Sequence, residues 1–585
     1  MSRAGSDDPM ALSNALTRLT QEVSAGLEAG SAPILERVTP VTAELLLWWF
    51  GEAARRRRRN NFHWGQRQAI LNVIVAHEVI DGREPVDLDG QLRAGTMMDR
   101  QRQGRDPASD HPPHPQYCLR MPAASGKTWV LQALLLWQML NRTAALDEGR
   151  DDPRHSRHFL VVTPGLIDHE RLLRALVGRC RPDGGRDFAS SDIARLADLL
   201  VPPAHRSRVN RFVRDNVCSR YGIGLEGAGN GLLAVTDWRP VTQPGEPIHR
   251  QDGRVAGSPL EAPDPRREHG RLLAFLAALP DMVVFNYEAY PLRAPNSAAR
   301  DDGTQCQETL GRIARSKGRR FVQIDFSATP YDHVGIGRNR TRRYFPHVVA
   351  DFDLKSAIGQ GLVKSPVLER RRALDALPLA LKAVRDHHGH LALAEGQRLM
   401  LSIGLEKVQA LERNFATIDA QRRPTMLVMC EDPRVVPLVA RYLQREGLHQ
   451  DDILTIESGR KTELDEAQWA GLRQRLFDIR QHAGPRVIVS TLMLREGLDV
   501  DNLCVIVPLR ASRGPVLMEQ TIGRGLRLMW REPEYADIKR ENRERISRRE
   551  PPGSSIDVLS IVEHPAFHGF YDELLAQGLA GQCSQ

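Results

Sequence analysis

The residues best suited to chemistry lie in a short loop, PAASGKT, at positions 122–128. An apolar run precedes this loop and a segment of helical periodicity follows it, so small residues there let backbone N–H groups surround a phosphate at a helix N-terminus. Lys127 would reach the β- and γ-phosphates of a nucleotide, and the Thr128 hydroxyl would bind Mg²⁺. The alternative is a chance Gly-Lys-Thr in a turn. The predicted nucleotide-binding residues of the loop are Ala124, Ser125, Gly126, Lys127 and Thr128.

A carboxylate follows another apolar run, in the stretch DMVVFNYEAY at 281–290. Four apolar residues predict a buried strand, and the polar residues after it would reach the edge of a parallel sheet where ligands bind. Glu288 could position an attacking water there and contact the metal. On a straight strand Asn286 points to the same face as Glu288 and could offer an amide oxygen, whereas Tyr287 points away.

Two arginines near the C-terminal end, Arg524 and Arg527 in EQTIGRGLR, are three residues apart and share one face of a predicted helix. Guanidinium groups aimed at a γ-phosphate stabilise the charge of the transition state. Gln520, one turn earlier on that face, could bind the phosphate or water. A solvated basic helix end is the alternative.

The stretch REGLDV, at 495–500, follows a predicted strand. Its Gly497 and Asp499 suit a contact between two lobes near the ribose of a nucleotide. A simple turn is the alternative interpretation.

Short apolar runs alternate with longer segments of helical periodicity from residue 117 onward. Continuous apolar strands between helices predict a parallel sheet that is covered on both faces, which is an α/β fold. The runs fall into two sets, so we expect two α/β lobes. The predicted strands are HFLVVT (158–163), LLAVT (232–236), MVVF (282–285), FVQIDFSA (321–328), TMLVM (425–429), RVIVS (486–490) and LCVIVPL (503–509).

Polar or small residues end most of these runs, and the carboxyl ends of parallel strands converge on one crevice. These strand ends are therefore candidates for contacts with ligands. They are Thr163, Pro164, Gly165, Thr236, Ser327, Ala328, Thr329, Ser490 and Thr491.

Four segments follow from these patterns. Residues 1–115 are predicted as an N-terminal helical region with a linker, and 116–335 as the first lobe with an insertion around 180–270. Residues 336–422 are predicted as a mostly helical connector, and 423–585 as the second lobe. The run Arg55–Arg59 is either a solvated helix end or a phosphate contact. His111 and His114 have no second ligand cluster nearby, which argues against a metal site.

The order of these motifs resembles that of the superfamily 2 (DEAD/DEAH-type) helicase motors, specifically the ATP-dependent DNA-translocating (Res) subunit of type III restriction enzymes. The resemblance runs from about Leu45 to the last residues and implies two RecA-like lobes that hold ATP and Mg²⁺ between them. It makes Gln66 in NFHWGQRQAI the adenine-sensing residue and Ser327-Ala328-Thr329 the segment that couples ATP state to DNA grip. It also implies that the strand ends at Thr163-Pro164-Gly165, Thr236 and Ser490-Thr491 contact nucleic acid.

The sequence departs from this family at the Asp-Glu-Ala-His box, where it has Tyr287-Glu288-Ala289-Tyr290. A rival alignment makes this stretch an earlier strand end and supposes that the box is missing, but LAVTDW already fills that earlier position. The family's aspartate holds Mg²⁺, and a neutral tyrosine is a poor substitute because Mg²⁺ prefers hard oxygen ligands. Loss of this aspartate would lower the rate of ATP hydrolysis by roughly 10²–10⁴-fold. At the phosphate loop, Met121 stands where the family usually has its first glycine. Ala124 stands where many ATPases have glycine.

Two functions therefore stay open. One is an ATP-dependent translocase or helicase-like motor on duplex DNA, with RNA not excluded. The other is a pseudo-motor that binds nucleotide and DNA but hardly hydrolyses ATP. No stretch of the sequence offers a paired-carboxylate nuclease site, so a separate specificity, methyltransferase or nuclease subunit is expected as a partner.

The bulk composition agrees with either function. A chain of 585 residues is expected to form about two to four domains. Its 41% hydrophobic and 26% charged residues are typical of a soluble globular protein, and its net charge of +8 suits a polyanionic partner. Seven scattered cysteines, a polar N-terminus and no long apolar run predict a cytoplasmic protein without a membrane span.

Overall fold

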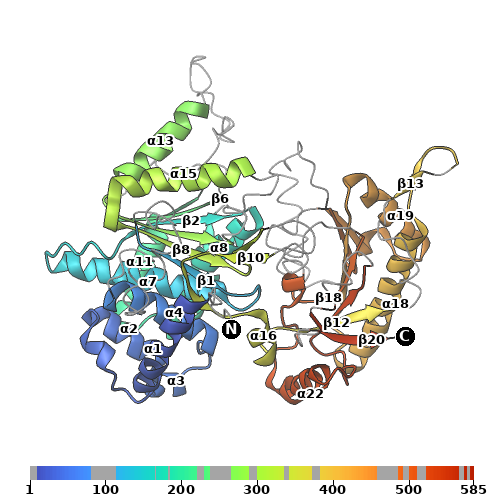
Figure 1. The fold of residues 1–585 in the computed structure, drawn as a ribbon, viewed down its shortest axis with the longest axis horizontal. Coiled ribbons are helices and arrows are strands. Elements are labelled where there is room, and N and C mark those ends of the chain that lie inside the picture. The colour runs from blue at the N-terminus through green and yellow to red at the C-terminus, as the bar shows by residue number, and fades with distance from the viewer. Residues whose placement is uncertain are drawn as a thin grey trace, which may run out of the picture. The chain divides into compact units, whose positions relative to one another are not determined.

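The structure is a computed structural model in which two compact units are built on separate sheets (Figure 1). Unit 1 comprises Met1–Met121 and Gly126–Phe352, and unit 2 comprises Pro122–Ser125 and Asp353–Gln585. The residues that the structure describes are 10–80, 114–164, 166–181, 185–219, 230–237, 265–288, 300–334, 341–371, 383–385, 387–456, 485–491, 500–509, 522–564, 572, 574–575 and 580–584.

Unit 1 contains a seven-stranded sheet in which all neighbouring strands are parallel. The strand that leads into the PAASGKT loop is separated from the strand that ends at Tyr287 by a single strand, the one that carries Ser327. The spatial order is β11 (Val348–Asp351), β1 (Gln116–Arg120), β8 (Phe321–Ser327), β7 (Met282–Tyr287), β2 (His158–Thr163), β6 (Leu232–Asp237) and β5 (Val217–Ser219).

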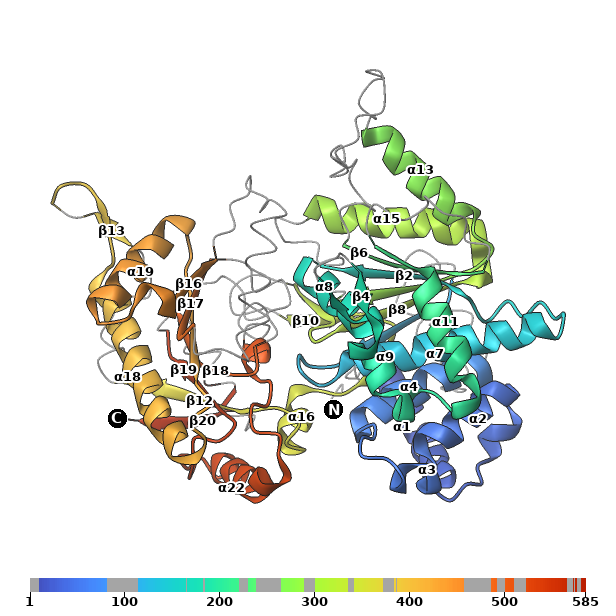
Figure 2. The ribbon, with the colours of Figure 1, turned by 180° about the vertical axis from the view of Figure 1, so that it is seen from behind.

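Helices cover both faces of this sheet (Figure 2). On one face α7 (Lys127–Asp147) and the N-terminal helices share one apolar core with the sheet. On the other face α13 (Pro265–Ala278) and α15 (Arg300–Lys317) pack against it. The N-terminal region thus belongs to unit 1. Its elements are α1 (Ala11–Glu28), η1 (Pro33–Glu36), α2 (Pro40–Phe50), α3 (Glu52–Arg56), α4 (Trp64–Ile74) and the π-helical turn η2 (Val75–Val79).

The arginine run after α2 makes contacts within unit 1. Arg55 pairs with Glu28 at 2.9 Å, and Arg56 pairs with Glu52. Arg58 donates to the carbonyls of Trp49 and Leu199. These contacts agree with a structured helix end, and they engage three of the five guanidinium groups that a phosphate contact would use.

The segment between β2 and β6 is built of short elements. It begins with α8, the helix that follows β2, and returns to the edge of the sheet as β5. The elements are α8 (Leu166–Val177), β3 (Arg179–Cys180), β4 (Arg186–Asp187), η3 (Phe188–Ser190), α9 (Asp192–Arg195), α10 (Ala197–Leu200), η4 (Pro203–His205) and α11 (Arg206–Asn216).

Unit 2 contains a second seven-stranded parallel sheet. Helix α18 (Glu395–Ile418) and helix α19 (Val436–Arg445) share an apolar core with it. The unit also contains the short helix α16 (Leu354–Gly359) and the helix α22 (Ala536–Ser547). The spatial order of strands is β16 (Ile453–Ile456), β17 (Val487–Ser490), β15 (Thr425–Met429), β18 (Leu503–Pro508), β19 (Val558–Val562), β12 (Ser365–Arg370) and β20 (Gly581–Ser584).

The prediction of an α/β fold with two parallel sheets is confirmed, and all seven predicted strands are strands. The segment that the sequence assigned to a mostly helical connector, 336–422, also contributes β11 to the first sheet and β12 to the second. Two small ribbons lie in or beside this segment, β9 (Tyr331–Val334) with β10 (Thr341–Tyr344) and β13 (Val384–Arg385) with β14 (Leu391–Ala392). No helix among the described residues is long and apolar enough to cross a bilayer.

Candidate phosphate-binding site

The PAASGKT loop connects β1 directly to the first turn of α7. The Met121 N–H donates to the carbonyl of Ser327 at 3.0 Å, which fixes the start of the loop to β8. Ala124 and Gly126 have φ of 64° and 81°, and these left-handed residues turn the chain so that a helix of 21 residues can begin at Lys127. The Ser125 hydroxyl is committed to the Pro122 carbonyl at 2.8 Å. The first N–H groups of a long helix therefore lie at the loop, as anion binding requires.

Gln66, the predicted adenine-sensing residue, contacts the backbone of this loop. Its amide nitrogen donates to the Gly126 carbonyl at 3.1 Å, and its amide oxygen accepts from the backbone N–H of His63 at 3.1 Å. A Cβ at position 126 would lie 2.3 Å from that nitrogen. Gln66 is buried and couples α4 to the loop.

Three of the predicted site residues meet at the end of β7. Lys127 forms an ion pair with Glu288 through Nζ and Oε1, and the Thr128 hydroxyl lies 3.3 Å from the hydroxyl of Tyr287. Glu288 has a φ of 64°, a left-handed conformation that is uncommon for a residue with a side chain. Tyr287 and Glu288 together face the phosphate loop.

One expectation about this strand is wrong. Alternation along a straight strand places Asn286 and Glu288 on the same face and Tyr287 on the other. In the structure the backbone of Glu288 leaves the strand conformation, so its side chain turns toward the loop beside Tyr287. The Asn286 amide instead donates to Asp325 at 2.7 Å. Asp325 also accepts from Gln323 and pairs with His347, so Asn286 belongs to a buried polar cluster.

Arg171, on α8, is a site residue that the sequence did not single out. Its Nη2 donates to the Tyr287 hydroxyl, and its guanidinium carbon lies 5.2 Å from the centre of the Tyr287 ring. Lys127 Nζ lies 5.8 Å from the same ring centre. Asp168 pairs with Arg171 at 3.6 Å from one helical turn earlier. The Tyr287 side chain thus lies among two cations and the Thr128 hydroxyl.

These residues fit Mg²⁺ poorly. The sequence predicts Thr128 and Glu288 as ligands, but Glu288 is paired with Lys127 and the Thr128 hydroxyl faces a neutral phenol. Mg²⁺ requires hard oxygen ligands in octahedral geometry, usually with one or two carboxylates available to it. Across the described residues no three His, Cys, Asp or Glu side chains group as a metal site.

Buried charge holds the other end of β7. Asp281, just before the strand, accepts from His158 Nδ1 at 2.7 Å and from the Ser156 hydroxyl at 2.6 Å, and Arg142 lies 3.3 Å away. Burial acts to raise the pKa of Asp281, but these hydrogen bonds and charges outweigh it and lower that pKa. The strand that carries Tyr287 is therefore anchored at its start.

The predicted strand-end residues are mostly inside the units. The Thr163 hydroxyl donates to the Thr236 carbonyl at 3.2 Å, and both side chains are buried, as are those of Ser490 and Thr491 in unit 2. Pro164 follows Thr163 directly. In the Ser327-Ala328-Thr329 segment the Thr329 N–H donates to the Ser327 hydroxyl at 3.1 Å, and Ala328 lies between them. The nucleic-acid and coupling roles of these residues stay predictions.

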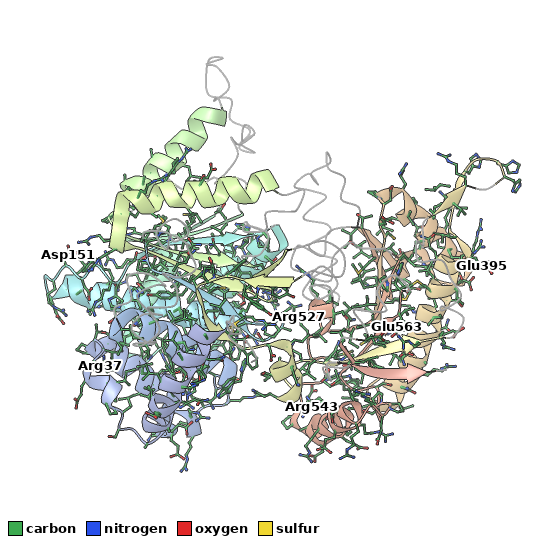
Figure 3. All side chains as sticks on the ribbon, viewed as in Figure 1. Arg37, Asp151, Glu395, Arg527, Arg543 and Glu563 are labelled. Carbon is green, nitrogen blue, oxygen red and sulfur yellow. The ribbon has the colours of Figure 1, made fainter. Side chains whose placement is uncertain are left out.

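The arginine segment of unit 2, residues 522–530, is held through hydrogen bonds of its backbone, and Figure 3 labels Arg527 within it. Residues 522–525 form a short helix, and Arg527 Nη1 donates to the carbonyl of Arg524 at 3.3 Å. The Leu526 carbonyl accepts from the backbone of Lys364 at 2.7 Å. Asp557 then accepts from the N–H groups of Met529 at 2.8 Å and Trp530 at 3.2 Å.

Close packing also fixes this segment. A Cβ on Gly525 would lie 2.9 Å from the Leu559 side chain on β19, so the helix packs directly against the sheet. The predicted approach of Arg524 and Arg527 to a phosphate at the loop joins residues of different units and stays a prediction. The remaining predicted residues, Gly165, Gln520, Gly497 and Asp499, together with Ala289 and Tyr290, lie outside the described residues.

Comparisons with known proteins give fold similarity at low sequence identity. No protein-family model matches the chain, and no curated protein matches its sequence. A fragment described as an HsdR subunit of a type I restriction enzyme from Vibrio vulnificus YJ016 is 12% identical with a TM-score of 0.44, over 89% of this chain and 68% of that one. The ATP-dependent Type ISP restriction-modification enzyme LlaBIII, bound to DNA, is 12% identical with a TM-score of 0.43, over 89% and 33%.

A third solved structure is the Mycobacterium smegmatis helicase Lhr bound to ssDNA and AMP-PNP. It is 13% identical with a TM-score of 0.40, over 88% of this chain and 50% of that one. The chain thus spans about a third of the LlaBIII chain and half of the Lhr chain. Similarity at this level does not assign the chain to a family.

Proposed function

We propose that the chain is a nucleotide-dependent nucleic-acid-binding protein, built on the scaffold of two-lobed motor ATPases, that hydrolyses ATP slowly or not at all. The observation that carries the proposal is the Tyr287 hydroxyl 3.3 Å from Thr128, at the place where a motor needs a carboxylate.

Nucleotide binding is supported by the loop itself. Left-handed backbone at Ala124 and Gly126 brings the chain to the N-terminus of α7, where N–H groups and the helix dipole favour a phosphate. Lys127 lies in the first turn of that helix, where its ammonium group would add charge-assisted hydrogen bonds. Gln66 braces the loop from α4.

Weak hydrolysis is supported by the partners of the reacting groups. A general base or water-positioning carboxylate must be within hydrogen-bond reach of the water. Glu288 is the only predicted carboxylate of the box, and it is engaged by Lys127. A phenol in place of the second carboxylate supplies no negative charge near the phosphate. Together these features leave binding groups intact and remove part of the catalytic set.

The second candidate is an active motor: an ATP-dependent translocase or helicase on duplex DNA of the type III restriction kind. The left-handed backbone of Glu288 favours it, because strained backbone at a site is often part of a mechanism. A triphosphate that draws Lys127 to its own oxygens would release Glu288 to position water.

Nucleic-acid binding in both candidates is supported by the net charge of +8. Binding through phosphates should weaken steeply with salt. We expect a cytoplasmic protein that acts with a separate specificity, methyltransferase or nuclease subunit.

The decisive experiment compares ATP hydrolysis by the native chain, Lys127→Ala, Tyr287→Asp and the matched control Tyr287→Phe, each with and without duplex DNA. We expect background turnover from the native chain and from Tyr287→Phe, and a rise in Tyr287→Asp, because only that variant gains a carboxylate. Robust DNA-stimulated hydrolysis by the native chain that Lys127→Ala abolishes would establish the active motor instead.

A further inference from the structure

Arg171 lies where a phosphate loop usually has its divalent cation. Its Nη2 donates to the Tyr287 hydroxyl, and that hydroxyl is 3.3 Å from the Thr128 hydroxyl, the expected metal ligand. The guanidinium carbon is 5.2 Å from the Tyr287 ring centre, so the arginine also packs on the aromatic face. Asp168, at 3.6 Å, orients it from the preceding turn of α8. A fixed cation of the protein thus occupies the neighbourhood of Thr128.

The two cations described at this point are each paired with a carboxylate. Lys127 is paired with Glu288, and Arg171 is paired with Asp168, so two cations face two carboxylates. A divalent cation beside Thr128 would meet two positive groups and a neutral phenol. Like charges at such separations repel strongly where water is partly excluded, so the arrangement disfavours a metal.

The same two cations suit a polyphosphate. A guanidinium presents several N–H donors in a plane that matches phosphate oxygens, and an ammonium group binds phosphate as a point charge. Arg171 thus adds one fixed positive charge near Thr128 to that of the loop lysine. Both lie at the loop where the N-terminus of α7 is ready for an anion.

We propose that Arg171, together with Lys127, takes the place of the divalent cation at this loop, so that the chain binds a nucleoside triphosphate without Mg²⁺. This inference rests on the proposed nucleotide binding and specifies how the phosphates are neutralised. Tyr287 has a positioning role in it: its hydroxyl and ring hold the guanidinium beside Thr128.

The test is equilibrium binding of a fluorescent ATP analogue to the full chain, in excess EDTA and in excess MgCl₂. We expect affinities that differ by less than about twofold between the two buffers. Arg171→Gln should weaken binding in EDTA by about 10- to 100-fold, which is the effect of losing a charge-assisted contact. Arg179→Gln, an exposed arginine on β3 in the same unit, removes the same charge and should bind as the native chain does.

The comparison of the two buffers for the native chain keeps the test valid if Arg171→Gln fails to fold, because it needs no substitution. The double variant Arg171→Gln/Tyr287→Asp restores a carboxylate beside Thr128 and removes the guanidinium, so its binding should require Mg²⁺. Native binding that is lost in EDTA and restored by Mg²⁺ would overturn this inference and leave nucleotide binding standing. An unchanged affinity of folded Arg171→Gln in EDTA would overturn it too, whereas no binding by the native chain in either buffer would remove the proposed function itself.

Discussion

The two regions that the sequence assigns to a triphosphate are built in opposite ways. Beside the phosphate loop, functional side chains of unit 1 contact one another: Lys127 pairs with Glu288, and Tyr287 contacts Thr128 and Arg171. At the arginine segment of unit 2, the described contacts include hydrogen bonds of the backbone, with the Lys364 N–H and with the Asp557 carboxylate.

Because of this difference, substitutions in the two regions should affect different properties, ligand affinity in one and stability in the other. A ligand at the loop must exchange contacts with the side chains that now satisfy one another, so substitutions there should act on affinity. The arginine segment is positioned through buried groups that no ligand would need to displace. Substitutions of those groups should therefore act on the stability of unit 2 first.

The largest effect is expected from Asp557→Ala. Asp557 is buried, accepts two backbone N–H groups of the arginine segment and lies 3.7 Å from Lys539. Its removal leaves the two N–H donors without their acceptor and takes the carboxylate from beside Lys539, which keeps its hydrogen bond to the Trp530 carbonyl. We expect a cost of about 3–5 kcal/mol of stability. Hydrogen exchange measured by mass spectrometry should show faster exchange in β18 and β19 and no change in β1.

Two matched variants sharpen this result. Asp557→Asn keeps an acceptor oxygen and should lose less stability than Asp557→Ala. Asp537→Ala removes an exposed carboxylate of α22 and should change little. If Asp557→Ala lowered the protection from hydrogen exchange equally in β1 and β19, the separation between the units would be contradicted.

Acid should weaken unit 1 before unit 2. Glu78 is buried in unit 1 and accepts from Thr39, Thr42 and Trp137. Burial acts to raise its pKa, but hydrogen bonds and the charge of His155 lower the pKa of Glu78 to about 2 from a usual 4.5. A carboxylate whose pKa is lower in the folded chain than in the unfolded chain stabilises the fold at every pH above its unfolded pKa. This stabilisation is lost as the pH falls through the folded pKa. Unit 1 should thus lose about 3 kcal/mol between about pH 4.5 and pH 2.

Unit 2 offers the opposite case. Burial raises the pKa of Asp557, so protonation of this residue favours the folded unit as the pH falls through that raised pKa. Hydrogen exchange can be measured at decreasing pH and corrected for the intrinsic exchange rate. It should show that unit 1 unfolds at a higher pH than unit 2 does. Glu78→Gln should reduce the stability of unit 1 at neutral pH. It should also make that stability depend less on pH in the acid range, which we call the acid limb. An acid limb in Glu78→Gln as steep as the native one would show that other groups are responsible.

The strands and the loop residues Lys127 and Thr128 were predictable from the sequence, whereas the contact of Arg171 with Tyr287 and the backbone turn at Glu288 were not. Continuous apolar runs mark strands that are buried on both faces, and all seven runs are strands of the two sheets. Alternation failed at Glu288 because its left-handed backbone ends the strand period. Arg171 is one of 81 basic residues, and only the folding of α8 beside β7 brings it to Tyr287. The loop motif fixed Lys127 and Thr128 in advance because the spacing itself defines the turn.

Two glycines separate backbone conformation from packing. At Gly126 the backbone has a φ of 81°, and an added Cβ would lie 2.3 Å from a Gln66 nitrogen. At Gly525 an added Cβ would lie 2.9 Å from the Leu559 side chain. Each substitution by alanine should cost about 1–3 kcal/mol. Gly126→Ala should also weaken ATP-analogue binding, and Gly525→Ala should lower the unfolding temperature of unit 2.

Controls for both glycines exist within unit 1. Gly149 has a φ of 67° and no atom within 4 Å of an added Cβ, so Gly149→Ala reports backbone strain alone. Gly311, in α15, has neither constraint, so Gly311→Ala should be neutral or stabilising. If Gly126→Ala were no worse than Gly149→Ala, the contact with Gln66 would not constrain the loop.

The smallest effect is expected from Ala124→Gly, which tests whether the loop stores strain for binding. Ala124 has a φ of 64°, and a left-handed L-residue costs roughly 1–2 kcal/mol, partly offset in glycine by about 0.4–1 kcal/mol of unfolded-chain entropy. The variant should gain about 0.5–1 kcal/mol in thermal unfolding. Arg549→Gly, at the same φ of 64° after α22 in unit 2, should gain a similar amount. Only Ala124→Gly should also bind the ATP analogue more weakly, because the freed loop must be ordered again on binding; equal affinities would mean that the strain at Ala124 serves the turn and not the ligand.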